Sequence, residues 1–250
     1  MTKPTILLTG AAGRIGQAVA QELGSVARGF DLVPTPNLKD FVVGDLLDVD
    51  TVRTAVEGIE TIVHLAATPD DVEDHEVVEK LFQPNIVGVY NLLEAARHAN
   101  VKRLILASSG QTVWYQRDRG PYPISTDTLP TPRGWYACTK MFLEAAGRSF
   151  HEKYGMSVIL VRLGWCPRDR SHVQAISEHE PSQDIYMSPR DAGRFFAAAV
   201  RAPESTQFAI VYATSKPLHS SPYDLEPTRR LIGFEPEDQW PQGIEVVTGA

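Results

Sequence analysis

The chain has 250 residues, of which 43% are hydrophobic, and its formal net charge is −7. This length suits one large α/β domain, so residues 1–250 are expected to form a single domain. The acidic residues are scattered along the chain, and the basic residues form no stripe that would bind a phosphate backbone. We therefore expect no nucleic-acid partner. No apolar run approaches the ~20 residues of a membrane span, so no membrane partner is expected.

The cysteine and histidine content points to a reducing compartment and to a site without metal. The two cysteines, Cys138 and Cys166, suggest no disulfide framework. The N-terminus passes directly into an apolar strand, and we therefore expect no signal peptide and a cytoplasmic location. The seven histidines show no ligand spacing with carboxylates or cysteines, so no metal is expected.

Apolar segments alternate with helical patterns along the chain. Most of the apolar segments are continuous Val, Ile and Leu runs, which is typical of parallel strands covered on both faces. The expected strands are 5–9, 27–31, 41–44, 61–66, 103–108, 157–163 and 208–213. The expected helices are 14–23, 50–57, 76–99, 135–154, 189–201 and one near 223–232. This alternation predicts a doubly wound α/β fold of the Rossmann type with a parallel sheet.

Outside this pattern the sequence predicts a cap and several loops. Asp50 is expected to cap its helix, because a carboxylate accepts from free backbone N–H groups. Residues 165–187 have little periodicity and are expected to be loop-rich. Together with residues 214–250 they are expected to form a small C-terminal annex that binds substrate. Residues 114–133 either form one wall of a pocket or merely cover the sheet.

Three glycines between the first strand and the first helix predict a dinucleotide site. Gly10 permits a sharp turn, Gly13 lets the backbone approach a phosphate, and Gly16 lets the helix pack closely on the strand. The start of the helix, with Arg14 and Ile15, offers free N–H groups and partial positive charge to a pyrophosphate. The alternative is a glycine turn that binds no ligand.

The ends of the next strands refine the cofactor prediction. Asp31 follows Gly16 by fifteen residues, and its carboxylate would accept from both ribose hydroxyls and repel a 2′-phosphate. This favours NAD over NADP, unless Asp31 is simply a solvated residue. Asp45 either accepts from the adenine amine or belongs to a turn. His64 is expected to be structural. The small residues after it would let a cofactor lie against the backbone; they are Leu65, Ala66 and Ala67.

Tyr136 and Lys140 are four residues apart and share one helix face. Phenol ionises near pH ~10, and lowering its pKa to near 7 requires ~4 kcal/mol of preferential phenolate stabilisation. An adjacent ammonium and an oxidised nicotinamide supply stabilisation of this kind, and Lys140 can also hold the ribose. Ser109, favoured over Ser108, would hold the substrate oxygen while Tyr136 takes its proton. The alternative for Tyr136 and Lys140 is an ordinary amphipathic helix. The alternative for the two serines is that they only form hydrogen bonds with backbone groups at the end of the strand.

With these residues the chain resembles the extended short-chain dehydrogenase/reductases over nearly its whole length. The resemblance implies an NAD(P)-binding Rossmann fold and catalysis by Ser109, Tyr136 and Lys140. It also implies a structural Asn85 and a homodimer or larger homo-oligomer paired through the long helices. Leu46 and Asn85 are grouped with the cofactor-binding residues on this basis. The matching segments are the glycine motif, Asp31, 44–46, 64–67, 85–96, Ser108-Ser109 and Tyr136 with Lys140.

Within that superfamily the chain is most similar to the uronate dehydrogenases, which oxidise C1 of a hexuronic acid with NAD to a lactone. The similarity lies in Trp135-Tyr136, Val161-Arg162-Leu163-Gly164 with Cys166, Ser188-Pro189 with Asp191, 201–203 and 230–236. Two departures leave the substrate open. Gly110-Gln111 replaces Asn-His, and Gln174 falls where those enzymes place a carboxylate-binding arginine. Arg168 or Arg170 would then bind the carboxylate, because a guanidinium fork suits carboxylate or phosphate.

The resulting hypothesis is an NAD-dependent dehydrogenase acting on C1 of a hexuronic acid or related sugar. The expected substrate contacts are Thr68, Ser109, Gly110, Gln111, Trp165, Arg168, Arg170 and Gln174. A sugar-phosphate dehydrogenase remains an alternative, since the same arginines suit a phosphate. A nucleotide-sugar epimerase or dehydratase and a non-catalytic NAD-sensing scaffold on the same fold also remain.

Overall fold

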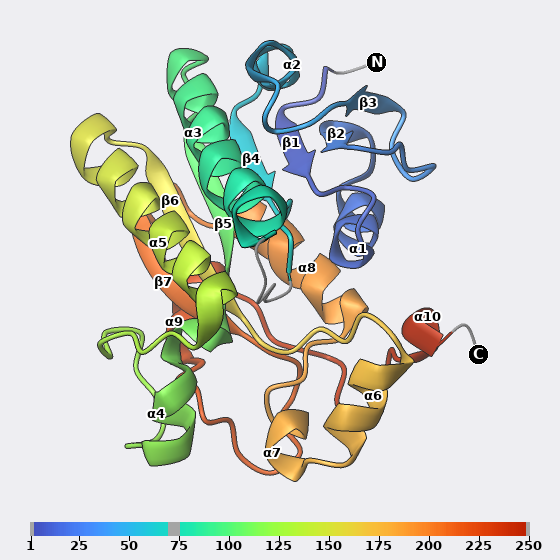
Figure 1. Ribbon diagram of the computed structural model, residues 1–250, viewed down its shortest axis with the longest axis vertical. Helices are drawn as coiled ribbons and strands as arrows, with labels where there is room; N and C mark the ends of the chain where they lie inside the picture. Colours follow the sequence, from blue (N-terminus) through green and yellow to red (C-terminus); the bar gives the residue numbers. More distant parts are fainter. Residues whose placement is uncertain (1–2, 70–75, 249–250) are drawn as a thin grey trace.

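Seven parallel strands form one central sheet in the computed structural model, which describes residues 3–69 and 76–248 (Figure 1). The sheet order is β3-β2-β1-β4-β5-β6-β7, so the chain builds outward from β1 in both directions. This arrangement confirms the predicted doubly wound fold. The strands are β1 (Ile6–Thr9), β2 (Ala27–Asp31), β3 (Asp40–Val43), β4 (Thr61–His64), β5 (Arg103–Ser109), β6 (Ser157–Leu163) and β7 (Phe208–Ala213).

Helices cover both faces of the sheet because successive strand residues point to opposite sides. In β1, Leu8 packs in a core with α1 (Arg14–Leu23), α8 (Pro189–Val200) and α9 (Glu226–Ile232). Its neighbour Leu7 packs in a second core with α2 (Val49–Val56), α3 (Gly88–His98) and α5 (Gly134–Tyr154). Both leucines are fully buried, which explains why the strands read as continuous apolar runs.

Two helix predictions need correction. Asp48, not Asp50, caps α2, and its carboxylate accepts from the backbone N–H groups of Asp50 and Thr51. The expected helix 76–99 is two segments, a wide-turned helix η2 (Val78–Val87) followed by α3. Pro84 lies inside η2, and because proline lacks a backbone donor it disfavours the regular α-helical bonding pattern there.

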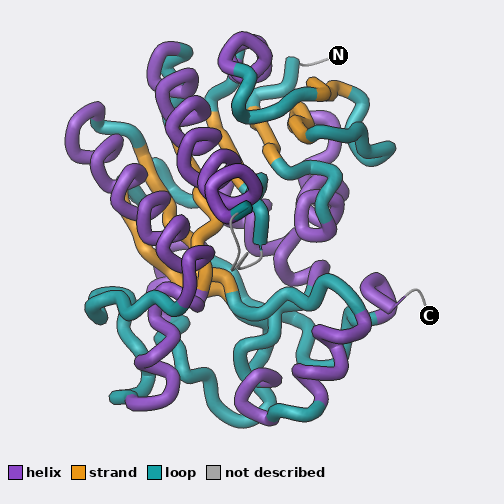
Figure 2. Tube along the Cα trace, in the orientation of Figure 1, coloured by secondary structure: helices purple, strands orange, loops and turns teal. Residues whose placement is uncertain are grey.

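Short helices occupy several stretches that the sequence predicts as loops. Residues 165–187 contain α6 (Arg170–Ser177) and α7 (Glu180–Gln183), and Asp169 caps α6 by accepting from His172 N at 3.0 Å. These segments lie with α4 (Trp114–Arg119) beyond one end of the sheet (Figures 1 and 2). The remaining short helices are η1 (Gly24–Val26), η3 (Gly110–Val113) and α10 (Glu245–Thr248). None of the helices in the described part of the chain is long and apolar enough to cross a bilayer.

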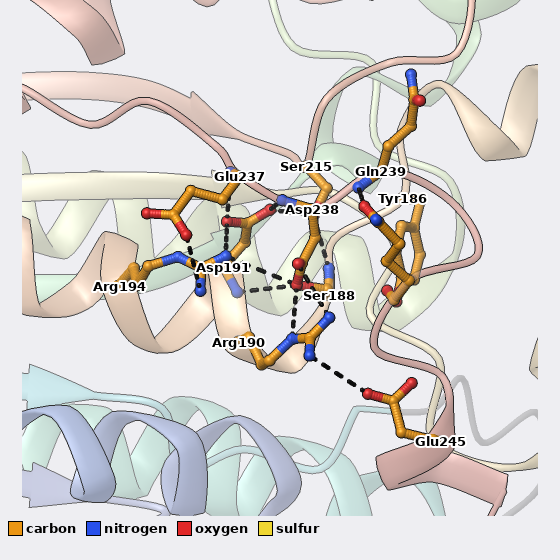
Figure 3. Close-up of polar contacts among 11 residues, drawn as sticks. Tyr186, Ser188, Arg190, Asp191, Arg194, Ser215, Glu237, Asp238, Gln239 and Glu245 are labelled. Carbon is orange, nitrogen blue, oxygen red and sulfur yellow. Dashed lines mark hydrogen bonds and ion pairs between the residues drawn. The ribbon is translucent and has the colours of Figure 1, made fainter.

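A buried polar network fastens the C-terminal segment to the start of α8 (Figure 3). Asp191 is fully buried, and its Oδ2 accepts from Ser215 Oγ at 2.7 Å and from Asp238 N at 3.0 Å. Asp238 in turn accepts from Ser188 Oγ and from the guanidinium of Arg190.

Candidate active site

A cleft of about 490 Å³ lies where β1, β4, β5 and β6 end. The carboxyl ends of parallel strands are where open α/β sheets bind ligands. Residues predicted for the cofactor, for catalysis and for the substrate meet in this one cleft. Those that line it are Gly10, Gly13, Arg14, Ile15, Gly16, Leu65, Ala67, Ser109, Gly110, Gln111, Tyr136, Lys140, Trp165 and Arg168.

The glycine loop fits a dinucleotide pyrophosphate. Gly10 has a φ of 72°, and a Cβ there would lie 2.7 Å from the backbone nitrogen of Ala66. A Cβ on Gly16 would lie 1.9 Å from the carbonyl oxygen of Gly10, so neither position admits a side chain without a backbone shift. Within the described part of the chain, no side chain caps the start of α1 at Gly13. The N–H groups there therefore remain for an anion.

Asp31 lies at the end of β2, beside the glycine loop. Its Oδ2 accepts from Ala12 N at 2.9 Å and its Oδ1 accepts from Leu32 N at 2.7 Å. These bonds fix the carboxylate and leave lone pairs for hydroxyl donors. The position is the one from which a carboxylate contacts an adenosine ribose in this type of fold.

Several residues expected near the cofactor support the cleft from outside its lining. Asp45 accepts from Leu47 N in a turn, and Leu46 is buried under α3 beside Gly88. Asn85 exchanges two hydrogen bonds with the backbone of Thr68, at 2.8 and 2.9 Å. Its amide also donates to Thr139 Oγ1 on α5 at 3.2 Å. Asn85 thereby ties the loop after β4 to the helix that carries Tyr136. Ala66 and Thr68 belong to that loop and are not in the lining.

Tyr136 and Lys140 lie within the first two turns of α5 and both face the cleft. The ammonium of Lys140 is 5.6 Å from the centroid of the Tyr136 ring and donates to the carbonyl oxygen of Ala107 at 2.8 Å. Lys140 is only 5% exposed, and burial lowers its pKa to about 8. The pair therefore has a cation fixed beside a half-buried phenol at neutral pH.

The two serines at the end of β5 differ in their partners. Ser108 Oγ donates to the buried carboxylate of Glu144 at 2.6 Å. Glu144 also pairs with Arg162 through two hydrogen bonds, at 2.9 and 3.0 Å. Among the described residues, Ser109 Oγ accepts only from Gln111 N, at 3.1 Å, and its own proton is left for another acceptor. This difference supports the choice of Ser109 as the residue that contacts a substrate oxygen.

His64 and Cys166 are poorly suited to proton transfer at neutral pH. His64 Nδ1 bonds to Thr9 Oγ1 at 2.7 Å, and burial together with the charge of Lys140 lowers its pKa to about 3. The imidazole is therefore neutral, as expected of a structural histidine. Burial raises the pKa of Cys166 to about 12, so its thiol stays protonated.

The substrate predictions beyond β6 divide into two groups. Trp165 and Arg168 line the cleft. Arg170 and Gln174 are on α6 outside the lining, and Gln174 donates to Glu178 at 2.7 Å. Gln174 therefore stands where the resemblance expects an arginine, but it does not reach the cleft.

Four lining residues with polar or aromatic side chains are not among the predicted site residues, although two of them belong to segment 114–133, for which a pocket wall is one of the two alternatives. They are Trp114 and Arg117 on α4, His172 on α6 and Tyr223. Trp114 and Arg117 thus place α4 at the cleft, which favours the pocket-wall alternative for the first part of segment 114–133. The spacing of Trp114 and Arg117 is that of neighbours on a helix, the only local signal for this wall. Nothing local marks Tyr223.

Comparisons with known proteins agree with this geometry. A sequence model described as the NAD dependent epimerase/dehydratase family matches residues 6–165. The chain is 33% identical to the uronate dehydrogenase of Agrobacterium fabrum over 206 residues, which cover 79% of this chain and 72% of that one. It is 28% identical to the NAD-dependent glucose-6-phosphate dehydrogenase of Haloferax volcanii over 253 residues, which cover 93% of each.

Solved structures of uronate dehydrogenase share the fold of this chain. The crystal structure of uronate dehydrogenase from Agrobacterium tumefaciens superposes with a TM-score of 0.74 at 30% identity, covering 95% of this chain and 86% of that one. A complex of the same enzyme with NAD, in a mutant form, superposes with a TM-score of 0.75. The predicted similarity to extended short-chain dehydrogenases and the predicted cofactor are confirmed. The chain belongs to the NAD dependent epimerase/dehydratase family and is an NAD-dependent oxidoreductase.

Proposed function

We propose that the protein oxidises the anomeric C1 hydroxyl of a hexuronic acid or related anionic sugar to a lactone. The observation that carries this proposal is the meeting of Ser109, Tyr136 and Lys140 with the glycine loop in one cleft. A base, an oxygen-binding hydroxyl and a dinucleotide cradle in one cleft are the requirements of alcohol oxidation.

The glycine loop and the start of α1 would hold NAD, which when bound would supply the acceptor for the hydride of C1. Ser109 Oγ holds the C1 hydroxyl, and Tyr136, as phenolate, removes its proton while the C–O bond becomes a carbonyl. Lys140 stabilises the phenolate electrostatically. Because the product carbon lies next to the ring oxygen, the carbonyl product of a cyclic sugar is a lactone.

The pH dependence of the reaction tests the part of Lys140. Lys140 is protonated below its pKa of about 8 and loses its charge above it. Lys140→Met removes the cation at every pH, so the ascending limb of the pH profile of kcat/KM should move up by about one to three units. The difference in rate between the wild type and Lys140→Met should be largest below pH 8. It should become smaller above pH 8, where Lys140 of the wild type is itself neutral.

Lys153→Met, at an exposed position of the same helix, is the matched control. A pH profile of Lys140→Met that coincides with those of the wild type and Lys153→Met contradicts this role. Stopped assays of NADH at each pH, with enzyme stability checked separately, provide the comparison.

The charge of the cleft supports an anionic substrate. Among the described residues that line it there is no Asp or Glu, whereas Arg117, Lys140 and Arg168 contribute positive charge. A carboxylate or a phosphate on the sugar suits this lining. The similarity to a uronate dehydrogenase favours the carboxylate. The similarity to a glucose-6-phosphate dehydrogenase keeps a sugar phosphate as the second candidate.

A nucleotide-sugar epimerase or dehydratase is less well supported. A dehydratase needs acidic groups near the serine for elimination, and Ser109 is followed by Gly110 and Gln111. The lining described here contains no carboxylate for that purpose. An epimerase would return the hydride to the sugar and accumulate no NADH, which separates the two reactions experimentally.

An NAD-reduction screen over hexuronates, neutral sugars and sugar phosphates tests the proposal. We expect stoichiometric NADH from a hexuronate and at least about tenfold lower kcat/KM for the matching neutral sugar, since each lost charged hydrogen bond costs about 1.5–3 kcal/mol. NADP should be a poor substitute if Asp31 repels the 2′-phosphate. Tight copurification of NAD without net NADH from any sugar contradicts the proposal and supports an epimerase.

We also propose that subunits pair through η2, α3 and α5. These helices carry large apolar side chains that are exposed in the single chain, and pairing of two subunits would bury them. The residues are Val78, Val87, Tyr90, Trp135, Phe142 and Tyr154. A cytoplasmic location remains a prediction from the sequence.

A further inference from the structure

The cleft has positive side chains at widely separated places. Arg14 begins α1, whereas Arg117 lies on α4, and Figure 1 shows these helices far apart in the molecule. The whole chain is acidic, with a formal net charge of −7. A cation-lined cleft in an acidic protein favours anionic ligands. The pyrophosphate of NAD accounts for the end near Arg14, so the charge at Arg117 calls for a second anionic group.

Arg117 is held in place but its donors are not all used. Its guanidinium carbon lies 4.0 Å from the centroid of the Trp114 ring, and Arg133 approaches the same ring at 4.8 Å. No ion pair with a carboxylate is found for Arg117 among the described residues, and its buried Nε has no hydrogen-bond partner there. A buried donor left without an acceptor costs free energy, which a ligand oxygen would recover.

Tyr223 presents a second unused donor beside the proposed catalytic serine. It is 2% exposed, and its ring stacks on Tyr212 with centroids 4.4 Å apart and an interplanar angle of 2°. A Cβ on Gly110 would lie 2.4 Å from the Tyr223 oxygen, so glycine at 110 is what lets the phenol approach. The Arg117 guanidinium lies beside that oxygen, and the phenol O–H has no acceptor within the described part of the chain. Gly110 directly follows Ser109, which places the phenol near the reaction centre.

Arg117 and Tyr223 act as a pair of donors. Burial raises the pKa of Tyr223, and the positive charge of Arg117, its hydrogen bond to the phenol oxygen and the charge of Arg162 oppose this only in part. The phenol therefore keeps its proton at neutral pH and donates rather than accepts. A neutral O–H beside a guanidinium matches the two oxygens of a carboxylate or two oxygens of a phosphate.

We infer that Arg117 and Tyr223 bind the anionic group that the sugar carries at C6, an assignment that rests on the proposed function. In a pyranose only the ring oxygen and C5 separate C1 from C6, so an anion at C6 stays near the reacting carbon. The same pair suits the carboxylate of a hexuronate and the phosphate of a hexose 6-phosphate. Arg168 lies at the cofactor end instead, because its backbone oxygen accepts from Arg14 at 2.7 Å.

Four variants of the full chain test the assignment. Arg117→Leu removes the guanidinium, Tyr223→Phe removes one oxygen, and Arg168→Leu removes the competing cation. Arg119→Leu is the matched control, because Arg119 is an exposed arginine on the same helix outside the cleft lining. For each, we would measure kcat and KM with glucuronate, glucose 6-phosphate and glucose. Calorimetric titration of glucuronate and of glucose 6-phosphate into the NAD-loaded protein gives Kd independently of turnover.

We expect Arg117→Leu to raise KM and Kd for the preferred anionic sugar by about 10- to 100-fold, and Tyr223→Phe by about tenfold. KM for NAD and the low activity on glucose should stay unchanged, and Arg119→Leu should match the wild type. Stronger wild-type binding of glucuronate identifies a carboxylate as the natural group, and stronger binding of glucose 6-phosphate identifies a phosphate.

The assignment is overturned if Arg117→Leu binds the anionic sugar as Arg119→Leu does, if Arg168→Leu alone weakens it, or if the wild type binds neither anion. Failure of the proposed function has a different signature. In that case the wild type binds an anionic sugar but produces no NADH, and the effect of Arg117→Leu on Kd still decides the assignment.

Discussion

Tyr136→Phe should lower kcat for NADH formation by about 100- to 10,000-fold on every accepted sugar, with the affinity for NAD retained. The substitution removes only the oxygen that takes the proton, and a positioned base contributes ~10²–10⁴-fold. The ring, the glycine loop and Lys140 remain, so the cofactor cradle is intact. Initial rates of NADH formation and a fluorescence titration of NADH binding measure the two properties separately.

The matched control is Tyr115→Phe, which removes the hydroxyl of an exposed tyrosine on α4. It should retain wild-type rates. Near-normal turnover by Tyr136→Phe would assign the proton transfer to another group. Loss of NAD binding together with turnover would mean that Tyr136 acts on the cofactor site and not on the proton.

Breaking the ion pair of Glu144 and Arg162 from one side should destabilise the fold by about 3–5 kcal/mol. Both side chains are buried, at 5% and 1% exposed, and share two hydrogen bonds. Glu144→Leu leaves a buried guanidinium without its carboxylate, and Arg162→Met leaves a buried carboxylate without its guanidinium. For a chain of this size each should lower Tm by about 6–20 °C.

The double variant Glu144→Leu with Arg162→Met separates the effect of the ionic interaction from the effect of side-chain packing. It leaves neither charge unpaired, so its loss of stability should be well below the sum of the single losses. Thermal unfolding of the four proteins gives the coupling free energy. If the losses of unfolding free energy in the two single variants add up to the loss in the double variant, the two charges do not stabilise each other and the prediction is wrong. Because Glu144 also accepts from Ser108, we expect the double variant to be less active even where it is folded.

The sheet and the cofactor loop could be predicted because their determinants are local. Leu7 and Leu8 point to opposite faces and are both fully buried, so the strand reads as an unbroken apolar run. The glycines at 10 and 16 have no alternative residue, since a Cβ would meet backbone at both positions. Such constraints appear directly in the sequence.

The remaining wall of the cleft depends on contacts between distant segments. Tyr223 reaches Gly110 only because β7 and the segment after it bring Tyr223 beside Tyr212 and the end of β5. Helix α6 escaped prediction because the residues around its single buried apolar residue, Ile176, are mostly polar, and a cap at Asp169 sets its start. Between Asp48 and Asp50, the sequence offers two similar caps, and the extended backbone of Asp48 decides which one serves α2.

A pH titration of tyrosinate absorbance tests the central claim most directly, namely that Lys140 makes Tyr136 acidic enough to act as a base. The difference between the wild type and Tyr136→Phe, both loaded with NAD, isolates one of the eight tyrosines. The account predicts that one tyrosinate forms near pH ~7 in the wild type and is missing from the variant, in contrast to the ~10 of free phenol. If the two proteins titrate alike up to pH ~10, Tyr136 is not the base and the mechanism proposed for this cleft is wrong.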